Sequence, residues 1–268
     1  WLGTTIMSNW SDPLYVLDNE DDSVALLDTG DTVITRAQHI FIWKNRLFLI
    51  NTVEDGNDWH PQRIRWSDVL GGSTSGVVNF TATNYVDGEF QGEDDVPMLV
   101  RFFRGVPYVF FKQYVCPIKS QRVEEGLFTW GAPLEQWGSM SQNFGIRTKN
   151  GIMFLNQRNI DIFDGYRGQA IDLPKLRDFV DTFDNRKWHY ITGSESGERD
   201  SDLIYMTYAE NGQDVPNKIL EINTLDQTFS TAGIPLNAIY GFDGFYSPEW
   251  LLAPNVYDDD YAVDGAFD

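Results

Sequence analysis

Cysteine is almost absent from this chain, which holds only Cys116 among its 268 residues. A lone cysteine excludes an internal disulfide framework and a zinc site built from several thiolates. Because Cys116 lies in an apolar run, we predict a buried structural thiol rather than a reactive nucleophile. Long apolar runs are also missing. No stretch reaches the roughly 18 apolar residues of a membrane-spanning helix, so we expect no membrane span.

Basic residues are scarce. The chain has 20 Lys and Arg against 40 Asp and Glu, a formal net charge of −20. Contacts to nucleic-acid phosphates require Lys and Arg, so this charge argues against a sequence-specific nucleic-acid surface. It favours solubility and suits a surface that must not adhere to DNA. Proteins from saline habitats have the same composition, so the charge alone does not select one function.

Motifs for catalysis and for cofactor binding are missing as well. His39, His60 and His189 are far apart and lack metal-ligand spacing. The glycine-rich residues 71–76 lack the Gly-Lys-Ser/Thr ending of a phosphate-binding loop, and no Gly-x-Ser-x-Gly elbow occurs. We therefore predict no catalytic residue, no cofactor, no metal site and no enzyme. A glycosidase carboxylate pair stays open, because separation in space defines such pairs.

Acidic residues cluster at 18–22, 93–95 and 258–260. The spacing of their oxygen ligands does not fit a calcium-binding EF-hand loop, so we interpret all three clusters as solvated loops. The acidic tail at 258–268 is expected to be poorly ordered. The chain starts at Trp1 without a signal-peptide pattern, which we interpret as a fragment or a processed chain.

Aromatic residues are plentiful, at 15% of the chain, and this is typical of β-sheet proteins. Residues 40–43 and 47–50 are apolar runs separated by the short polar break Asn45-Arg46, which predicts a hairpin. A polar loop at 54–58 and an alternating run at 63–66 follow. Three consecutive antiparallel strands in so short a stretch are most of one propeller blade.

Further groups of strands follow along the chain. We predict them at 98–103, 106–112 and 114–119, at 143–148, 152–156 and 160–163, at 188–192, 203–208 and 218–223, and from 237 to 242. Asn150-Gly151 is a strong hairpin signal between two of these strands. Residues 175–184 are the one predicted helix, because their apolar residues recur at helical spacing.

An apolar residue precedes Asp-Gly at Asp87, Asp164 and Asp243, at intervals of about two blades of roughly 40 residues each. We therefore predict an all-β, propeller-like fold with blades of three to four antiparallel strands and one short inserted helix. We expect residues 1–268 to form a single domain. A β-sandwich or a barrel with irregular loops is the alternative.

Tryptophans offer candidate ligand contacts. Six of them could line a sugar-binding face, although in a β-rich chain such residues more often pack in the core. These are Trp59, Trp66, Trp130, Trp137, Trp188 and Trp250. Trp130 and Trp137 lie in a loop-like stretch near Gly131, Pro133 and Gly138, so we expect them to be the most exposed candidates for a glycan or partner contact.

Two motifs carry a family resemblance. Residues 44–49 read Lys-Asn-Arg-Leu-Phe-Leu, and residues 61–68 read Pro-Gln-Arg-Ile-Arg-Trp-Ser-Asp. Together they resemble a family of tailed-bacteriophage virion proteins, and similar segments continue in order across residues 40–244. The chain departs from the family after Ser67, where Val69-Leu70-Gly71-Gly72 replaces a Gly-Asp-Pro-x-x-Trp turn.

The resemblance implies a structural protein of the virion, in a tail nozzle or at the head–tail junction. Its expected partners are copies of itself in a ring and other tail or adaptor proteins, and it carries over no catalytic residues. An acidic lumen would repel the genome during DNA ejection. The alternative is a carbohydrate- or receptor-binding propeller module of a tail, with Trp130 and Trp137 as contacts.

Overall fold

The structure is a computed structural model. It describes residues 4–18, 23–30, 33–70, 78–88, 90, 95–121, 127–157, 159–171, 173, 175–195, 203–213, 216–233, 236–240 and 251–254. The predictions for residues 19–22, 71–76, 93–94 and 258–268, and for Asp243, lie outside these ranges.

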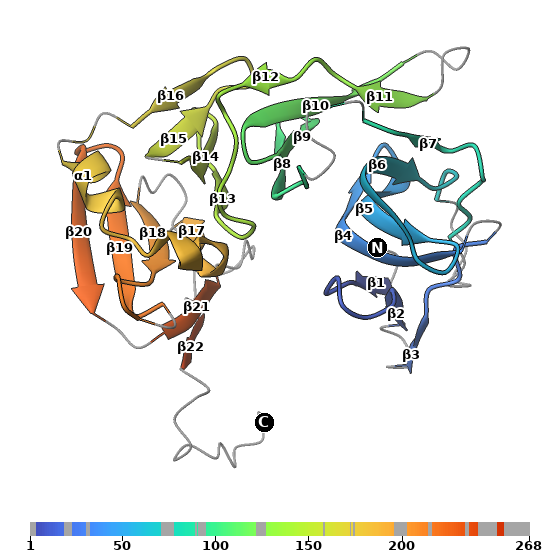
Figure 1. The fold of residues 1–268 in the computed structure, drawn as a ribbon, viewed down its shortest axis with the longest axis horizontal. Helices are drawn as coiled ribbons and strands as arrows, with labels where there is room; N and C mark the ends of the chain where they lie inside the picture. The colour runs from blue at the N-terminus through green and yellow to red at the C-terminus, as the bar shows by residue number, and fades with distance from the viewer. Residues whose placement is uncertain are drawn as a thin grey trace. The chain divides into compact units, whose positions relative to one another are not determined.

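Nearly all regular structure is β-strand, and the strands form successive antiparallel sheets (Figure 1). The first sheet is β1 (Thr4–Met7), β2 (Tyr15–Asp18) and β3 (Ser23–Leu26). The second is β4 (Ile34–Trp43), β5 (Arg46–Glu54), β6 (Asp58–Trp66) and β7 (Tyr85–Val86). The third is β8 (Leu99–Phe103), β9 (Val106–Phe110), β10 (Tyr114–Ser120), β11 (Phe128–Trp130) and β12 (Leu134–Glu135).

The remaining sheets continue this pattern. The fourth is β13 (Gly145–Arg147), β14 (Ile152–Leu155), β15 (Ile160–Phe163) and β16 (Gly168–Ala170). The fifth is β17 (Thr192–Glu195), β18 (Leu203–Tyr208), β19 (Lys218–Asn223) and β20 (Thr228–Gly233). The last described pair is β21 (Leu236–Tyr240) and β22 (Leu251–Pro254).

Strand order within each sheet follows the order of the sequence, apart from β12, which pairs with β10. Such up-and-down sheets of about four strands, repeated along a chain, are the blades of a β-propeller. The predicted all-β, propeller-like class is therefore confirmed.

The chain divides into two compact units. Unit 1 is Trp1–Val100 with Val106–Pro133, and unit 2 is Arg101–Gly105 with Leu134–Asp268. The single domain expected across residues 1–268 stays a prediction.

In unit 1, β5 is buried on both faces. Leu47 and Leu49 point into one core, and Phe48 and Ile50 point into a second core on the opposite face. Alternate side chains of a strand point to opposite faces, so β5 belongs to a sheet that is covered on both sides. This explains why the sequence here is a continuous apolar run rather than an alternating one.

In unit 2, the first strands of successive sheets lie side by side. A parallel bridge joins Asn143, just before β13, to Thr192 of β17, and β21 lies against β17. One shared core fills the space between the fourth and fifth sheets. Neighbouring propeller blades are expected to place their first strands side by side and to share a core between their sheets.

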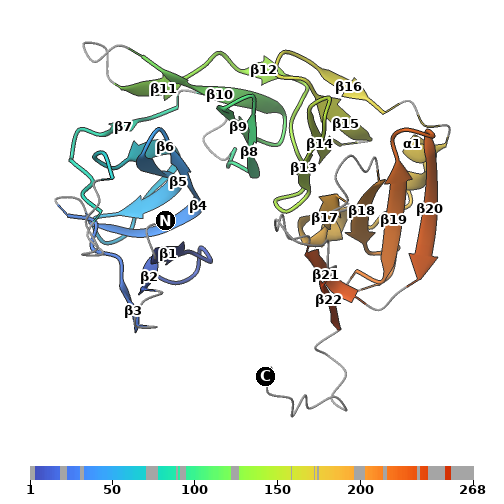
Figure 2. The same cartoon turned by 180° about the vertical axis from the view of Figure 1, so that it is seen from behind.

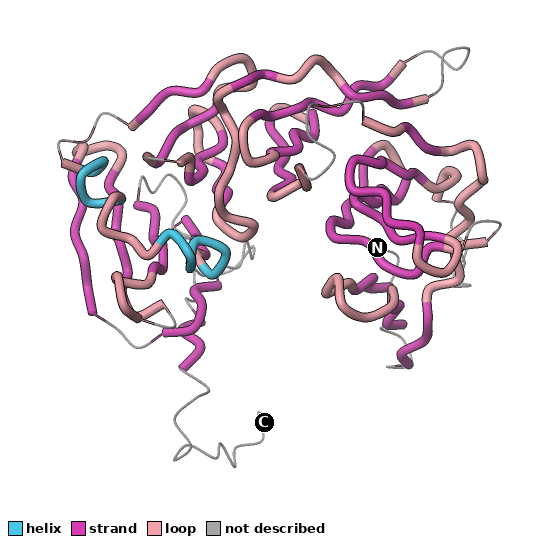
Figure 3. Tube along the Cα trace, in the orientation of Figure 1, coloured by secondary structure: helices cyan, strands magenta, loops and turns pink. Residues whose placement is uncertain are grey.

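The predicted helix is shorter than expected. Only Leu176–Val180 forms α1, and a 3-10 helix, η2, covers Asn185–Tyr190 (Figure 3). Both views place α1 at one end of the β17–β20 sheet (Figures 1 and 2). The apolar stripe is confirmed, since Leu176, Val180 and Phe183 are buried in the unit 2 core.

The strand predicted at 188–192 is wrong for all but its last residue. Asp184 caps η2, because its carboxylate accepts a hydrogen bond from the Arg186 backbone N–H. This cap stabilises the start of η2, which continues to Tyr190, and β17 begins only at Thr192.

The Asp-Gly pattern does not mark equivalent positions. Asp87-Gly88 follows β7, the fourth strand of its sheet, whereas Asp164-Gly165 forms the turn between the third and fourth strands, β15 and β16. The Asp-Gly pattern therefore led to the correct fold class, although the two described Asp-Gly pairs lie at different places in their sheets. Asp-Gly is favoured in many kinds of turn, so its recurrence does not mark a repeat.

Candidate functional site

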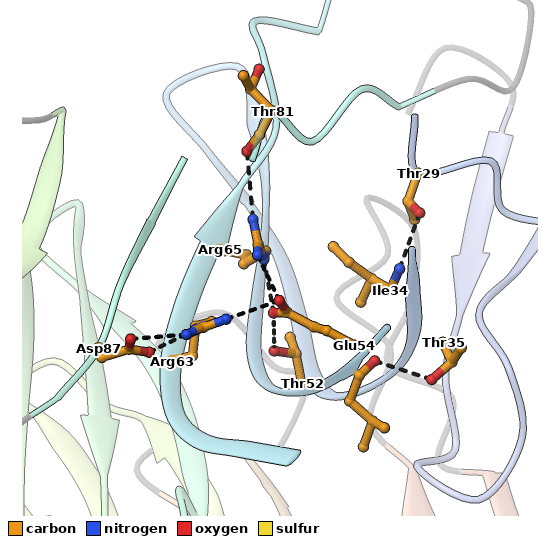
Figure 4. Close-up of polar contacts among 10 residues, drawn as sticks. Thr29, Ile34, Thr35, Thr52, Glu54, Arg63, Arg65, Thr81 and Asp87 are labelled. Carbon is orange, nitrogen blue, oxygen red and sulfur yellow. Dashed lines mark hydrogen bonds and ion pairs between the residues drawn. The ribbon is translucent and has the colours of Figure 1, made fainter. Parts of the chain in front are cut away.

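A buried ionic cluster lies on the hairpin that carries the family-like motifs. Glu54, the last residue of β5, accepts hydrogen bonds from Arg63 (2.9 Å) and from Arg65 (2.8 and 2.5 Å), both on β6 (Figure 4). The Thr52 hydroxyl donates a further bond of 2.6 Å to the same carboxylate. The side chains of Glu54 and Arg65 are only 2% and 5% exposed, so this is a buried pair.

The cluster reaches the surface through Arg63. Its guanidinium also donates two hydrogen bonds to Asp87, at 2.7 and 2.9 Å, and Asp87 is about half exposed. The Tyr85 ring lies against both cations, 4.2 Å from the Arg63 guanidinium carbon and 5.0 Å from that of Arg65. Cation–π contacts of this kind add to the ion pairs.

The electrostatics of the cluster keep Glu54 ionised. Burial disfavours its charged form, but hydrogen bonds from Arg65 and Thr52 and the charges of both arginines outweigh burial and lower its pKa. Burial also disfavours the Arg63 cation, but the hydrogen bond to Asp87 and the charge of Glu54 raise the pKa of Arg63. A carboxylate held this way is a poor general acid or base near neutral pH, so its role here is structural.

Other residues of the same motif also bond internally. The Gln62 side chain accepts from the Phe90 N–H (3.2 Å) and donates to the Asp95 carbonyl (3.3 Å). The Ser67 hydroxyl accepts from the Leu47 N–H at 2.9 Å. Each of these bonds ties β6, or the residue that follows it, to another segment of unit 1.

The first motif is anchored to the second. The Arg46 guanidinium donates to the Ser67 carbonyl at 2.6 Å, and the Leu70 N–H donates to the Asn45 carbonyl at 2.7 Å. Trp66 is buried in the core that Phe48 enters from β5, and the two rings lie 6.5 Å apart. The motifs therefore encode contacts within the hairpin.

A polar cluster holds the loop where the chain departs from the family pattern. The Asp68 carboxylate accepts hydrogen bonds from the side-chain amides of Asn79 (2.8 Å) and Asn84 (3.1 Å). The Asp68 N–H donates to the Asn79 carbonyl at 2.9 Å. These bonds order the described part of the loop without the turn that the family uses.

Cys116 is fully buried, as predicted. Burial, together with the nearby charge of Asp95, raises the pKa of its thiol to about 12. Thiolate is the reactive form of cysteine, so this residue is chemically inert in the folded chain.

Trp130 and Trp137 are both partly buried rather than exposed. Trp130 lies in β11 rather than in a loop, and its indole N–H donates to the Gln62 carbonyl at 3.1 Å. Its ring also packs against Phe90, with centroids 5.2 Å apart. A glycan contact at either tryptophan stays a prediction.

Trp59 is more exposed than either of them, at 47%, and its indole N–H donates to the Asn51 side chain at 2.6 Å. Its position next to the polar turn at 55–57 was the signal in the sequence that could have singled it out.

Within the described residues, no group of three or more His, Cys, Asp and Glu side chains could hold a metal ion. No helix in the described part of the chain is long and apolar enough to cross a membrane.

The fold and this hairpin define an all-β protein of propeller-like blades, held together in part by a buried ionic cluster. No protein-family model matches the chain, and no curated protein matches it. Among solved structures, the chain is similar to BamB from Moraxella catarrhalis at 12% identity and a TM-score of 0.46, covering 90% of this chain and 77% of that one. It is also similar to the N-terminal domain of Nup159 at 11% identity and a TM-score of 0.34, covering 82% and 57%. The fold class rests on the sheet topology above.

Proposed function

We propose that this chain is a structural component of a tailed-bacteriophage virion, in the tail or at the head–tail junction. It assembles as a ring with copies of itself, and it contacts other tail or adaptor proteins. Its blades form a rigid scaffold that presents loops to neighbouring subunits.

One observation carries the proposal: the residues that carry the family resemblance hold the hairpin together. Arg63 and Arg65 neutralise a buried carboxylate, and Gln62 and Ser67 bond to backbone groups. The polar side chains of this motif form hydrogen bonds and ion pairs within the protein. A family of structural proteins would be expected to keep such residues, because they preserve the shape of the blade rather than a reactive group.

The charge of the chain supports the same role. A net charge of −20 favours solubility, and an acidic surface along a DNA channel would repel the passing genome. We therefore expect the chain to bind duplex DNA weakly or not at all, and we expect an acidic surface to face the lumen of the assembly.

The test is a cryo-EM reconstruction of the intact particle that contains this chain, together with mass spectrometry of the purified particles. We expect the chain in the particle, as a ring in the tail or neck with an acidic lumen. Absence from purified particles would refute the proposal. A neutral or basic lumen would refute only the repulsion of DNA.

The alternative is carbohydrate or receptor binding by the tail, and a glycan array with the intact protein separates the two functions. Binding that is lost in Trp137→Ala, with the fold intact, would favour the alternative. Trp130→Ala is less informative, because it also removes packing and a hydrogen bond inside unit 1.

A further inference from the structure

Several exposed basic residues occupy turns of unit 2, although the chain as a whole is strongly acidic. Arg104 lies in the turn after β8, Lys149 lies in the turn between β13 and β14, and Arg167 ends the turn between β15 and β16. We call these three residues the basic tips.

Two of the basic tips, Arg167 and Arg104, act on Asp164. Arg167 lies 3.8 Å from the Asp164 carboxylate. Backbone N–H groups of Arg167 and Tyr166 lower the pKa of Asp164, and the charges of Arg167 and Arg104 lower it further. In β8, the strand that leads to Arg104, Arg101 donates a hydrogen bond to the Gly145 carbonyl of β13, so β8 lies beside this sheet. Asp164 therefore carries one negative charge beside the two positive charges of Arg104 and Arg167.

Strand register brings the third tip to the same end of the sheet. Ile152, the first residue of β14, pairs with Phe163, the last residue of β15. The turn that holds Lys149 therefore lies beside the turn that begins at Asp164. Lys149 and Arg167 consequently share one end of the fourth sheet, where the charge of Arg104 also acts on Asp164.

Tyr166 stands among the basic tips and is 80% exposed. Tyrosine and arginine are enriched where proteins bind one another, because each combines a large contact area with polar groups. A largely exposed tyrosine beside several basic side chains therefore gives this surface a composition that is typical of protein-binding surfaces.

The same chain carries a complementary element in unit 1. Asp55 is exposed in the turn between β5 and β6, Asp58 is exposed at the start of β6, and the adjacent Trp59 is 47% exposed. We call these three residues the acidic tip. It offers negative charge and an aromatic ring, which match the positive charge and the tyrosine of the basic tips.

We propose that the basic tips of one copy bind the acidic tip of the next copy, as a head-to-tail contact. This inference rests on the ring assembly in the proposed function. Such a contact joins two different surfaces, so it generates a closed ring when the rotation between copies closes. A second copy fits better than nucleic acid, because the net charge of −20 repels phosphate while every copy supplies one acidic tip.

Charge reversal on each side tests the contact. Lys149→Glu with Arg167→Glu reverses the basic side, and Asp55→Lys with Asp58→Lys reverses the acidic side. Asp55 has a left-handed backbone, with φ 42. Lys44 has a similar backbone, with φ 49, so a lysine can adopt the conformation that position 55 requires. Assembly is measured by light scattering and mass photometry at about 0.15 M salt, where charges interact over about 8 Å.

We expect each variant alone to assemble at least about 30-fold more weakly than the natural chain. An equimolar mixture of the two variants should restore assembly, because each contact between unlike copies again joins opposite charges. The matched control is Lys175→Glu with Arg177→Glu, which makes the same change in net charge at exposed positions near α1. The control should assemble like the natural chain.

Three outcomes would overturn the inference. The natural chain could stay monomeric at every concentration tested, the variants could assemble normally, or the mixture could fail to recover. Binding of a short DNA duplex that is lost with Lys149→Glu and Arg167→Glu would assign the basic tips to nucleic acid instead. Mass spectrometry of purified particles tests the virion role independently, so failure of this contact leaves that role standing.

Discussion

Arg65 donates two hydrogen bonds to Glu54, at 2.8 and 2.5 Å, and both side chains are almost completely buried. Such a pairing fixes the register of β5 against β6, because a shift of one residue would turn one of the two charges to the opposite face of the sheet. The ion pair therefore contributes to the specificity of the hairpin as well as to its stability.

Removal of the Glu54 charge should strongly destabilise the chain. In Glu54→Gln the Arg65 cation stays buried without its counter-charge, and breaking one side of a buried pair costs about 3 kcal/mol or more of unfolding free energy. Urea denaturation followed by tryptophan fluorescence measures the change. Asp87→Asn is the control at the exposed end of the cluster, and it should cost less than about 1 kcal/mol. Equal losses in the two variants would contradict the structural role of the buried pair.

Acid should weaken this same pair. The pKa of Glu54 is lower in the folded chain than its ordinary value of 4.5, so the unfolded chain takes up the proton first. The stabilisation is complete above about pH 4.5, and it is lost as the pH falls through the lower pKa of the folded state. Burial raises the pKa of Asp161, which acts in the opposite direction. The diagnostic quantity is therefore the difference in unfolding free energy between the natural chain and Glu54→Gln, which should shrink below pH 4.5. A constant difference would be inconsistent with this linkage.

The Cys116 thiol should not react in the folded chain. It is fully buried, and its pKa is raised to about 12, so almost no accessible thiolate exists at pH 8. Incubation with a thiol-reactive chromophore should give no signal until denaturant unfolds the protein, and then one equivalent. Rapid labelling under native conditions would show that Cys116 is accessible.

A side chain at position 168 should destabilise the folded chain. A Cβ at this position would overlap the indole ring of Trp137. Gly168→Ala should therefore lower the unfolding free energy by about 1–3 kcal/mol, as overpacking does. Gln169→Ala at the exposed neighbour is the control and should stay within about 0.5 kcal/mol.

A double variant separates the clash from other causes. If Gly168→Ala acts through the ring, its cost should fall when Trp137→Ala is already present, because residues in contact show non-additive effects. Additive losses would mean that the glycine is needed for another reason.

Much of the fold could be predicted from local patterns. The hairpin between β4 and β5, strands β8 to β10 and β13 to β15, and strands β18 and β19 lie within a few residues of their predicted ranges. Strands β11, β12 and β16 were not predicted. Apolar runs broken by short polar turns are sufficient for this, because strand pairing between sequence neighbours is encoded locally. The length of the helix was overestimated, because Lys175 is left-handed at φ 68 and Asp184 is the extended N-cap of a separate 3-10 helix.

The candidate site was less predictable. The sequence showed that Arg63 and Arg65 belong to a family-like motif, but not that they share Glu54, which lies nine residues or more away across a turn. Tryptophan exposure was also not evident. Trp130 is partly buried because Phe90, which is distant in sequence, packs on its ring, whereas Trp59 is exposed next to a polar turn.

The sequence by itself determined the all-β class, the succession of hairpins, the inert cysteine and the excess of negative charge, because composition and local periodicity encode these properties. Only the tertiary structure decided which charges meet. The pairing of Glu54 with two arginines, and the position of the Lys149 turn beside the turn that holds Asp164 and Arg167, depend on strand register and on contacts between different segments. Such contacts join residues distant in the chain, and local sequence patterns do not encode them.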